Sequence, residues 1–323
     1  MSLGSPRSAA GPDAVDAAKR LADLEANVEL VFRGSREAVR LAVVCLVARG
    51  HMLIEDVPGV GKTTLAQALA RSLGLSFQRI QFTSDLLPSD ILGVSIWSQH
   101  KETFEFVPGP IFASVVLADE INRATPKTQS ALLEAMSERQ VTVERRRLDL
   151  PDPFLVLATQ NPLEYLGTFP LPESQLDRFE MHLRLGYPQV SQERELLLRG
   201  GVEGELARLQ PVLSAEEVRA IQASAAEVTV SERLVDYVLA LAARTRQGEP
   251  FQLGVSTRAA LGLVRAAQAM ALAEGRDFVL PDDVQRLVVP VLAHRVLLRR
   301  GAASLDASRR ALEQVVAETP IPV

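Results

Sequence analysis

Residues 56–64 contain residue types at a spacing that suits the binding of phosphate, in the order Asp56-Val-Pro-Gly-Val-Gly-Lys-Thr-Thr64. Gly59 and Gly61 permit positive φ and carry no Cβ, so that backbone N–H groups can converge on phosphate oxygens. We expect Lys62 to pair with the β- and γ-phosphates of a nucleotide, and the Thr63 hydroxyl to ligate Mg²⁺. The residues predicted to hold the nucleotide in this loop are Pro58, Gly59, Val60, Gly61, Lys62, Thr63 and Thr64.

Two periodic segments flank this loop and are expected to position it. Residues 52–54 form an apolar run typical of a buried strand, and leucines at 65, 69 and 73 follow the loop at helical spacing. A phosphate-binding loop requires such a strand and helix, because the helix N-terminus adds partial positive charge. The usual pattern has glycine where this chain has Asp56, and we expect a changed entry turn there.

A second cluster lies at the end of the apolar run 114–120, which closes with Asp119 and Glu120. We expect this strand to lie beside the strand of the phosphate loop, so that both carboxylates reach the nucleotide. Asp119 would hold Mg²⁺ through water, because small, strongly hydrated Mg²⁺ keeps several waters. Glu120 would polarise a water for in-line attack on the γ-phosphate. The alternative is an ordinary strand end with two solvated acids.

The apolar run 154–159 leads into Gln160-Asn161-Pro162. The amide of Asn161 could hydrogen-bond both the γ-phosphate and the attacking water. A simple Asn-Pro turn is the alternative, and it stays open on this pattern alone.

The remaining patterns divide the chain into a strand-rich part and a helical part. Further strands are predicted at 77–82, 114–120, 154–159 and 181–185. They alternate with helices, which favours a parallel sheet covered on both faces. Residues 83–110 and 139–150 are expected to form loop or hairpin insertions. From residue 191 onward every period is helical, and Pro290 is expected to break or kink a helix that begins near Asp282.

We therefore predict an α/β domain at 19–188, in which a parallel central sheet lies between helical layers. An all-α domain at 189–323 is predicted to follow it. Residues 1–18 are rich in Ser, Gly, Pro and Ala without a period, and we expect them to be a disordered tail.

Composition excludes several classes of protein. The 323 residues carry a net charge of −5 and a pI of about 5.6, which gives no electrostatic footprint for nucleic acid. The single Cys45 rules out an internal disulfide framework, and the four histidines show no metal-ligand spacing. No apolar run is long enough to span a bilayer. We expect a cytoplasmic protein whose only metal is the Mg²⁺ that accompanies a nucleotide.

Six stretches together resemble the MoxR family of AAA+ ATPases. In chain order they are Asp56-Val-Pro-Gly-Val-Gly-Lys-Thr63, Leu117-Ala-Asp-Glu-Ile-Asn-Arg-Ala124, Gln129-Ser-Ala-Leu-Leu-Glu-Ala-Met136, Ala158-Thr-Gln-Asn-Pro162, Gly167-Thr-Phe-Pro-Leu-Pro172 and Gln175-Leu-Asp-Arg-Phe179. The resemblance covers residues 25–295 in unbroken order. It implies an AAA+ P-loop αβα sandwich with a parallel central sheet, followed by an all-α lid domain.

The resemblance also implies roles for individual residues. Lys62 and Thr63 match the Walker A motif, and Asp119 and Glu120 match Walker B. Asn161 matches the sensor-1 residue. Arg178 matches the arginine finger that reaches a neighbouring subunit's γ-phosphate, and Arg258 matches sensor 2. Residue ranges 93–106 and 139–150 resemble the helix-2 insertion and the pre-sensor-1 hairpin. Thr257 stands where the family usually has proline, which alters the expected start of the helix.

By this resemblance the chain is expected to hydrolyse ATP with Mg²⁺ in a hexameric ring and to remodel or mature a protein partner. That partner is expected to contain a von Willebrand factor A domain. Two alternatives stay open: a nucleic-acid motor that uses the basic run 145–147, and a magnesium-chelatase-like subunit. The acidic charge of the chain argues against the motor.

Overall fold

The computed structural model describes residues 13–143, 146–161, 167–247, 249–299 and 304–321. Its centre is a five-stranded parallel sheet in the order β2-β5-β8-β1-β9. The strands are β1 (Met52–Glu55), β2 (Phe77–Gln81), β5 (Val115–Asp119), β8 (Leu155–Gln160) and β9 (Met181–Leu183). All five lie in segments that were predicted to be strands, and β1, β5 and β8 coincide with apolar runs.

The order of the strands corrects one expectation. We expected β5 to lie directly beside β1, but β8 lies between them and pairs with both. The register sets Leu117 and Ala118 of β5 beside Leu157 and Ala158 of β8. All three strands are parallel, so their carboxyl ends still meet at one edge of the sheet, where ligands bind in open α/β folds.

Each face of the sheet is covered by helices, as predicted. Alternate residues of the strands enter two separate clusters of buried apolar side chains, one on either face. One cluster includes side chains of α1 (Ala14–Glu29), α2 (Arg36–Val47) and α3 (Lys62–Ser72), and the other includes those of α5 (Pro126–Glu138). Burial of both faces is the reason that the inner strands β1, β5 and β8 are nearly continuous apolar runs.

Helix α1 begins at Ala14, inside the range 1–18 that we expected to be a tail. Asp13 caps it by accepting a hydrogen bond from the backbone N–H of Asp16. The side chains of Ala17 and Leu21, in its first turns, are buried. The prediction of a tail was therefore wrong for residues 13–18. The alanine-rich composition concealed a helix that is stabilised by its cap and its apolar stripe. Residues 1–12 lie outside the described residues.

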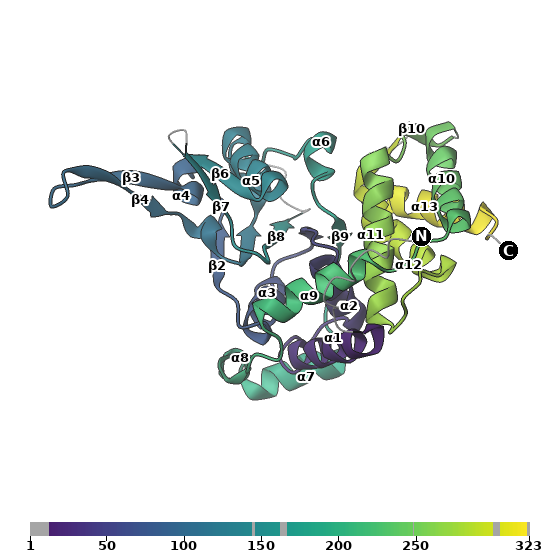
Figure 1. The fold of residues 1–323 in the computed structure, drawn as a ribbon, viewed down its shortest axis with the longest axis horizontal. Helices are drawn as coiled ribbons and strands as arrows, with labels where there is room; N and C mark the ends of the chain where they lie inside the picture. Colours follow the sequence, from purple (N-terminus) through teal and green to yellow (C-terminus); the bar gives the residue numbers. More distant parts are fainter. Residues whose placement is uncertain (1–12, 144–145, 162–166, 248, 300–303, 322–323) are drawn as a thin grey trace, which may run out of the picture.

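The two predicted insertions contain hairpins. Strands β3 (Gly93–Ser98) and β4 (Thr103–Pro108) pair antiparallel and project away from the body at the left of Figure 1. They follow the short helix α4 (Pro88–Leu92) and precede η1 (Pro110–Phe112). Strands β6 (Gln140–Val143) and β7 (Arg146–Asp149) form the second hairpin.

The C-terminal part is helical with one small sheet. Its helices are α7 (Val190–Arg199), α8 (Glu203–Arg208), α9 (Ala215–Ala226), α10 (Glu232–Gln247), α11 (Thr257–Ala273), α12 (Pro281–Leu292), η3 (Ala293–Arg295) and α13 (Leu305–Glu318). Strands β10 (Phe251–Leu253) and β11 (Leu297–Leu298) pair antiparallel, although the sequence showed only helical periods there. The predicted αβα sandwich followed by a helical domain is confirmed.

Pro290 does not break α12, which continues to Leu292. Proline removes one backbone donor near the end of the helix, where little of the helix remains to be disturbed. Figure 1 shows α10–α13 gathered at one side of the molecule, whereas α7 and α8 lie below the sheet beside α1 and α3.

Candidate functional site

The phosphate loop joins β1 to α3 in the predicted setting. Gly61 is the N-cap of α3 with φ of 92°, and Gly59 has φ of 87°. Nothing lies within 4 Å of the position that a Cβ at Gly59 would occupy. Such a loop leaves backbone N–H groups at a helix N-terminus open towards an anion. Thr63 is the second residue of α3, in the first turn of the helix that follows the loop.

The side chain of Lys62 folds back onto the loop, and its Nζ donates to the carbonyl oxygen of Asp56 at 2.7 Å. Burial lowers the pKa of this amine, and the charge of Asp119 opposes the effect. An ammonium group held by one neutral carbonyl in a partly buried site gains most from an added anion. Lys62 is thus placed to exchange its carbonyl partner for a phosphate.

Asp56 has a role that its departure from the usual pattern did not reveal. Its Oδ1 accepts from the backbone N–H of Val57 at 2.8 Å, and its Oδ2 accepts from Leu185 at 2.8 Å and Gly186 at 2.7 Å. The carboxylate therefore fixes the segment after β9 to the entry of the phosphate loop. We expected a changed entry turn at Asp56, and the change consists of these three hydrogen bonds to its carboxylate.

Asp119 ends β5 and is buried, at 9% exposure. Its Oδ1 accepts from the Thr159 hydroxyl at 2.5 Å, and its Oδ2 accepts from the Arg79 guanidinium at 2.5 and 3.1 Å. An ionised carboxylate has about four acceptor sites, two on each oxygen, so Oδ1 keeps capacity for a water bound to Mg²⁺ while Oδ2 is taken up by Arg79. Thr159 and Arg79 hold the carboxylate in one orientation at the edge of the sheet.

Glu120 adopts the left-handed backbone conformation, with φ of 58°, which turns its side chain away from the line of β5. Its N–H donates to the hydroxyl of Thr159 at 2.9 Å. Its Oε2 accepts from Gln81 Nε2 at 2.8 Å and lies 3.1 Å from Arg123. A non-glycine residue at positive φ stores strain, so its surroundings must fix this conformation. The side chains of Gln81 and Arg123 hold the Glu120 carboxylate, and a water molecule could take the place of Gln81.

Asn161 follows β8 directly and is 7% exposed. Glu55 is in register with Gln160, and Asp56 N donates to the Gln160 carbonyl at 3.2 Å. These pairings place Asn161 between the phosphate loop and the acids of β5. The predicted Asn-Pro turn runs into residues 162–166, outside the described residues.

An apolar cavity of about 370 Å³ adjoins the phosphate loop. It is lined by Gly59, Val60, Gly61 and Thr64 on one side and by side chains from two more distant segments. Those segments are Val31, Phe32 and Arg33 before α2, and Pro188, Leu196, Leu197, Gly200, Gly201 and Val202 around α7. Phe32 would lie 3.2 Å from a Cβ at Gly61, so the ring lies directly against the loop.

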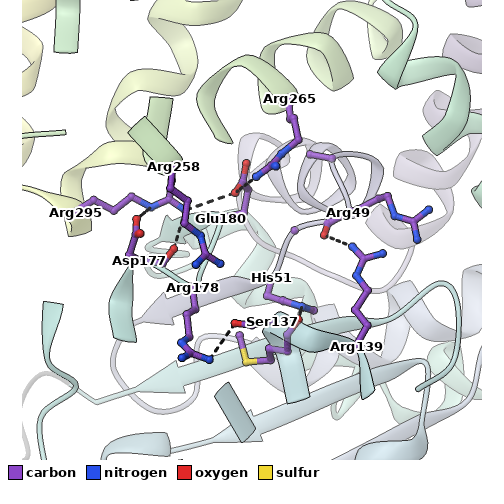
Figure 2. Close-up of a pocket in the computed structure, with 13 residues that line it drawn as sticks. Arg49, His51, Ser137, Arg139, Asp177, Arg178, Glu180, Arg258, Arg265 and Arg295 are labelled. Atoms are coloured by element: carbon purple, nitrogen blue, oxygen red, sulfur yellow. Dashed lines mark hydrogen bonds and ion pairs between the residues drawn. The ribbon is translucent and has the colours of Figure 1, made fainter. Parts of the chain in front are cut away.

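The two arginines that were predicted to act on the γ-phosphate lie apart from the phosphate loop. Arg178 and Arg258 line one cavity of about 390 Å³, whose described lining contains no residue of the loop. Figure 2 shows both side chains along its wall, with Arg178 directed at Ser137. Arg178 donates to the Leu133 carbonyl at 2.7 Å and to Ser137 Oγ at 3.0 Å.

Arg258 is exposed at the second position of α11, where Ser256 caps the helix by accepting from Ala259 N at 3.0 Å. Thr257 therefore opens the helix without proline, because Ser256 provides the cap. The same cavity is lined by four further arginines and two acids: Arg49, Arg139, Arg265, Arg295, Asp177 and Glu180.

The loop side fits a Mg²⁺–nucleotide. It combines a glycine cradle, a lysine whose ammonium donates to the Asp56 carbonyl, a carboxylate with free acceptor capacity and an adjoining apolar cavity of about 370 Å³. Within the described ranges, no group of three or more His, Cys, Asp or Glu side chains is arranged to hold a metal ion. None of the described helices is long and apolar enough to cross a membrane.

The sequence reasoning missed the residues that position the acids. Arg79 and Gln81 lie two apart on the edge strand β2, so period-2 alternation could have placed both on one face. Thr159 is a polar residue within an apolar run, which could have marked it. Phe32 and the α7 side chains lie far from the loop in sequence, and no local pattern links them to it.

Comparison with known proteins assigns both parts of the chain. Residues 51–181 match the model of the ATPase family associated with various cellular activities (AAA), and residues 243–316 match the AAA lid domain.

Two relatives align over most of their length. The chain is 46% identical to the uncharacterised protein YeaC of Bacillus subtilis, over 92% of this chain and 93% of that protein. It is 43% identical to the chaperone MoxR1 of Mycobacterium tuberculosis, over 87% of this chain and 77% of that protein. A crystal structure of "a putative ATPase" from Cytophaga hutchinsonii superposes with a TM-score of 0.87 at 38% identity, covering 95% of this chain and 96% of that one.

Proposed function

Because this chain belongs to the MoxR family of AAA+ ATPases, we propose that it hydrolyses ATP at sites shared between neighbouring copies in a cytoplasmic hexameric ring. The hydrolysis would drive the remodelling or maturation of a partner protein. The observation that carries this proposal is the separation of Arg178 and Arg258 from the phosphate loop, since they line a different cavity.

A single copy supplies only one side of the expected site. The carboxyl edge of the sheet carries the residues of the loop side, which are Lys62, Thr63, Asp119, Glu120 and Asn161. The hydrogen bond from Thr159 to Asp119 and the register of Glu55 with Gln160 support this grouping. The γ-phosphate carries charge that phosphoryl transfer must neutralise, and arginines commonly do this. A second copy that docks its Arg178–Arg258 cavity on this edge would complete the site.

Each residue of the loop side has a role in this proposal. When bound, Mg²⁺–ATP would supply the phosphoryl group, and the metal would neutralise charge that develops on it. Lys62 would exchange the Asp56 carbonyl for the phosphates. Thr63 and Asp119 would hold the metal, Asp119 through water. Glu120 leaves Gln81 and accepts a proton from the attacking water, which Asn161 helps to hold. The cavity beside Phe32 holds the base.

The β3–β4 hairpin supports a protein as the client. Its exposed side chains are largely apolar, with Val94, Ile96, Trp97 and Phe104 each at least 42% exposed. Trp97 and Phe104 pack edge to face across the strands, with ring centroids 5.2 Å apart. Exposed apolar clusters on a projecting element mark protein contacts. We propose that this hairpin contacts a client with a von Willebrand factor A domain.

The nucleic-acid motor is the second candidate. Arg146 and Arg147 are exposed on β7 and could track phosphates, while Arg145 lies outside the described residues. A magnesium-chelatase-like role would use the same ATP site in a larger complex.

The decisive test measures ATPase activity against protein concentration and added partners. The proposal predicts that activity per chain rises with concentration as rings assemble, and that a von Willebrand factor A partner alters turnover. Activity per chain that is constant down to the monomer would refute the shared site. Stimulation by single-stranded DNA, without any response to the protein partner, would favour the motor.

A further inference from the structure

Glu180 is a charged side chain buried at the junction of the sheet and the C-terminal helices, at 6% exposure. It directly precedes β9, and its N–H donates to the carbonyl of His51, just before β1, at 2.8 Å. A carboxylate removed from water costs much free energy unless charged partners compensate. A buried Glu180 carboxylate therefore requires positively charged partners close to it.

Two arginines from the C-terminal part compensate this charge. Arg265 of α11 and Arg295 of η3 approach Glu180 Oε2 at 3.6 and 3.5 Å. Arg295 is itself 6% exposed, and burial lowers its pKa against the opposing charges of Glu180 and Asp177. It also donates to the Phe179 carbonyl at 2.6 Å and lies 3.3 Å from Asp177 Oδ1. Figure 2 shows Glu180, Arg265 and Arg295 converging beside Arg258.

Two glycines make room for this carboxylate. A Cβ at Gly262, inside α11, would lie 2.9 Å from both Glu180 oxygens, and a Cβ at Gly50 would lie 2.3 Å from Glu180 Cβ. Glycine inside a helix lowers its stability, so a close approach is the physical reason for it. Helix α11 thus touches the Glu180 carboxylate with its backbone.

The position of Glu180 links the two arginines of the proposed shared site. Arg178 stands two residues before it, and Arg258 is the second residue of α11, the helix that carries Gly262 and Arg265. We propose that Glu180 is a positioning residue that, with Arg265 and Arg295, fixes the spacing between Arg178 and Arg258. The inference rests on the proposed function, in which both arginines act on a nucleotide held by another copy.

The test uses Glu180→Gln, which keeps the shape and removes the charge. Turnover should fall about tenfold or more, because small misplacements of catalytic groups cost up to about a hundredfold. Nucleotide affinity should be unchanged, because the loop of the same chain is intact. Mixed with Lys62→Ala chains, which keep intact arginines, Glu180→Gln chains should regain activity. Mixed with Arg178→Ala chains they should not, because both variants damage the same side.

A second variant covers the case in which Glu180→Gln does not fold, since removing one buried charge can destabilise a chain strongly. Gly262→Ala pushes a methyl group against the carboxylate and should show the same pattern. Gly204→Ala is its matched control, because a Cβ there meets no atom within 4 Å in helix α8.

The outcomes separate the two proposals. Mixing Arg178→Ala with Lys62→Ala tests the shared site by itself. If that pair regains activity while Gly262→Ala keeps normal turnover, or gains nothing from Lys62→Ala chains, the positioning role of Glu180 is refuted and the shared site stands. If Gly262→Ala is also rescued by Arg178→Ala chains, Glu180 and its arginines act on the phosphate-loop side and the inference is wrong.

Discussion

The hydroxyl of Thr159 donates to Asp119 Oδ1 at 2.5 Å and accepts from the backbone N–H of Glu120 at 2.9 Å. One buried side chain of β8 thereby fixes both acids at the end of β5. This contact exists because β8 lies between β1 and β5, which is the strand order that the sequence reasoning did not foresee. The interposed strand supplies the support for the acids.

Replacing Thr159 with Val keeps the shape but leaves the Asp119 oxygen and the Glu120 N–H without this partner. We expect turnover to fall about 10–100-fold, as is usual when a group behind a metal ligand is removed. More Mg²⁺ should be needed for half-maximal rate, whereas Thr159→Ser should stay near the parent chain. Titration of steady-state ATPase with Mg²⁺ checks both, and an unchanged Thr159→Val rate would contradict this role.

Glu120→Gln removes the proposed base but keeps a side chain that Gln81 and Arg123 can contact. We expect ATP to bind with nearly parental affinity and turnover to fall about 100-fold or more, which is the range for loss of a general base. Single-turnover assays with labelled ATP separate binding from chemistry. Glu313→Gln, on the exposed face of α13, is the control. Normal turnover in Glu120→Gln would exclude this base.

Asp56→Asn should weaken the entry of the phosphate loop. The amide has only one acceptor oxygen, so either Val57 N–H or the N–H groups of Leu185 and Gly186 lose their partner. We expect the free energy of unfolding to fall by about 1–3 kcal/mol, as for lost hydrogen bonds to a charged group. Urea denaturation and nucleotide binding measure the effect, with exposed Asp236→Asn as the control. Parental stability would show that these bonds contribute little.

Buried histidines should make the chain sensitive to acid. Burial lowers the pKa of His51 to about 4 and that of His182 to about 3, and it also lowers the pKa of His294. The folded pKa values lie below the unfolded value of 6.5, so the unfolded chain takes up protons first and the free energy of unfolding falls as pH drops below 6.5. At pH 5 the loss is about 2 kcal/mol each for His51 and His182.

Urea denaturation between pH 8 and pH 5 measures this loss. His51→Gln should reduce the pH dependence by about one proton. Glutamine can still accept from Val156 N–H and donate to the Met136 carbonyl, as His51 does at 3.1 Å each. The same slope in His51→Gln as in the parent chain would contradict the assignment of a neutral His51.

The sequence predicted the groups that carry the chemistry better than the groups that hold them. Lys62, Asp119 and Glu120 stand in local patterns whose chemistry dictates residue type, and they follow or end parallel strands at the same edge of the sheet. Arg79 and Phe32 act through contacts between distant segments, which no local period encodes. Helix α1 was missed at its start because its composition resembled a tail, while its cap and apolar stripe needed a partner surface to be recognised.

The most direct test of the central claim, that the site is shared between copies, is the ATPase activity of mixed Arg178→Ala and Lys62→Ala chains. Each variant alone should be inactive, for opposite reasons: one retains the loop and the other retains the arginines. Mixing should restore activity well above the sum of the two, because some interfaces then pair an intact loop with an intact arginine. Mixed assemblies that remain as inactive as their parts would contradict the account.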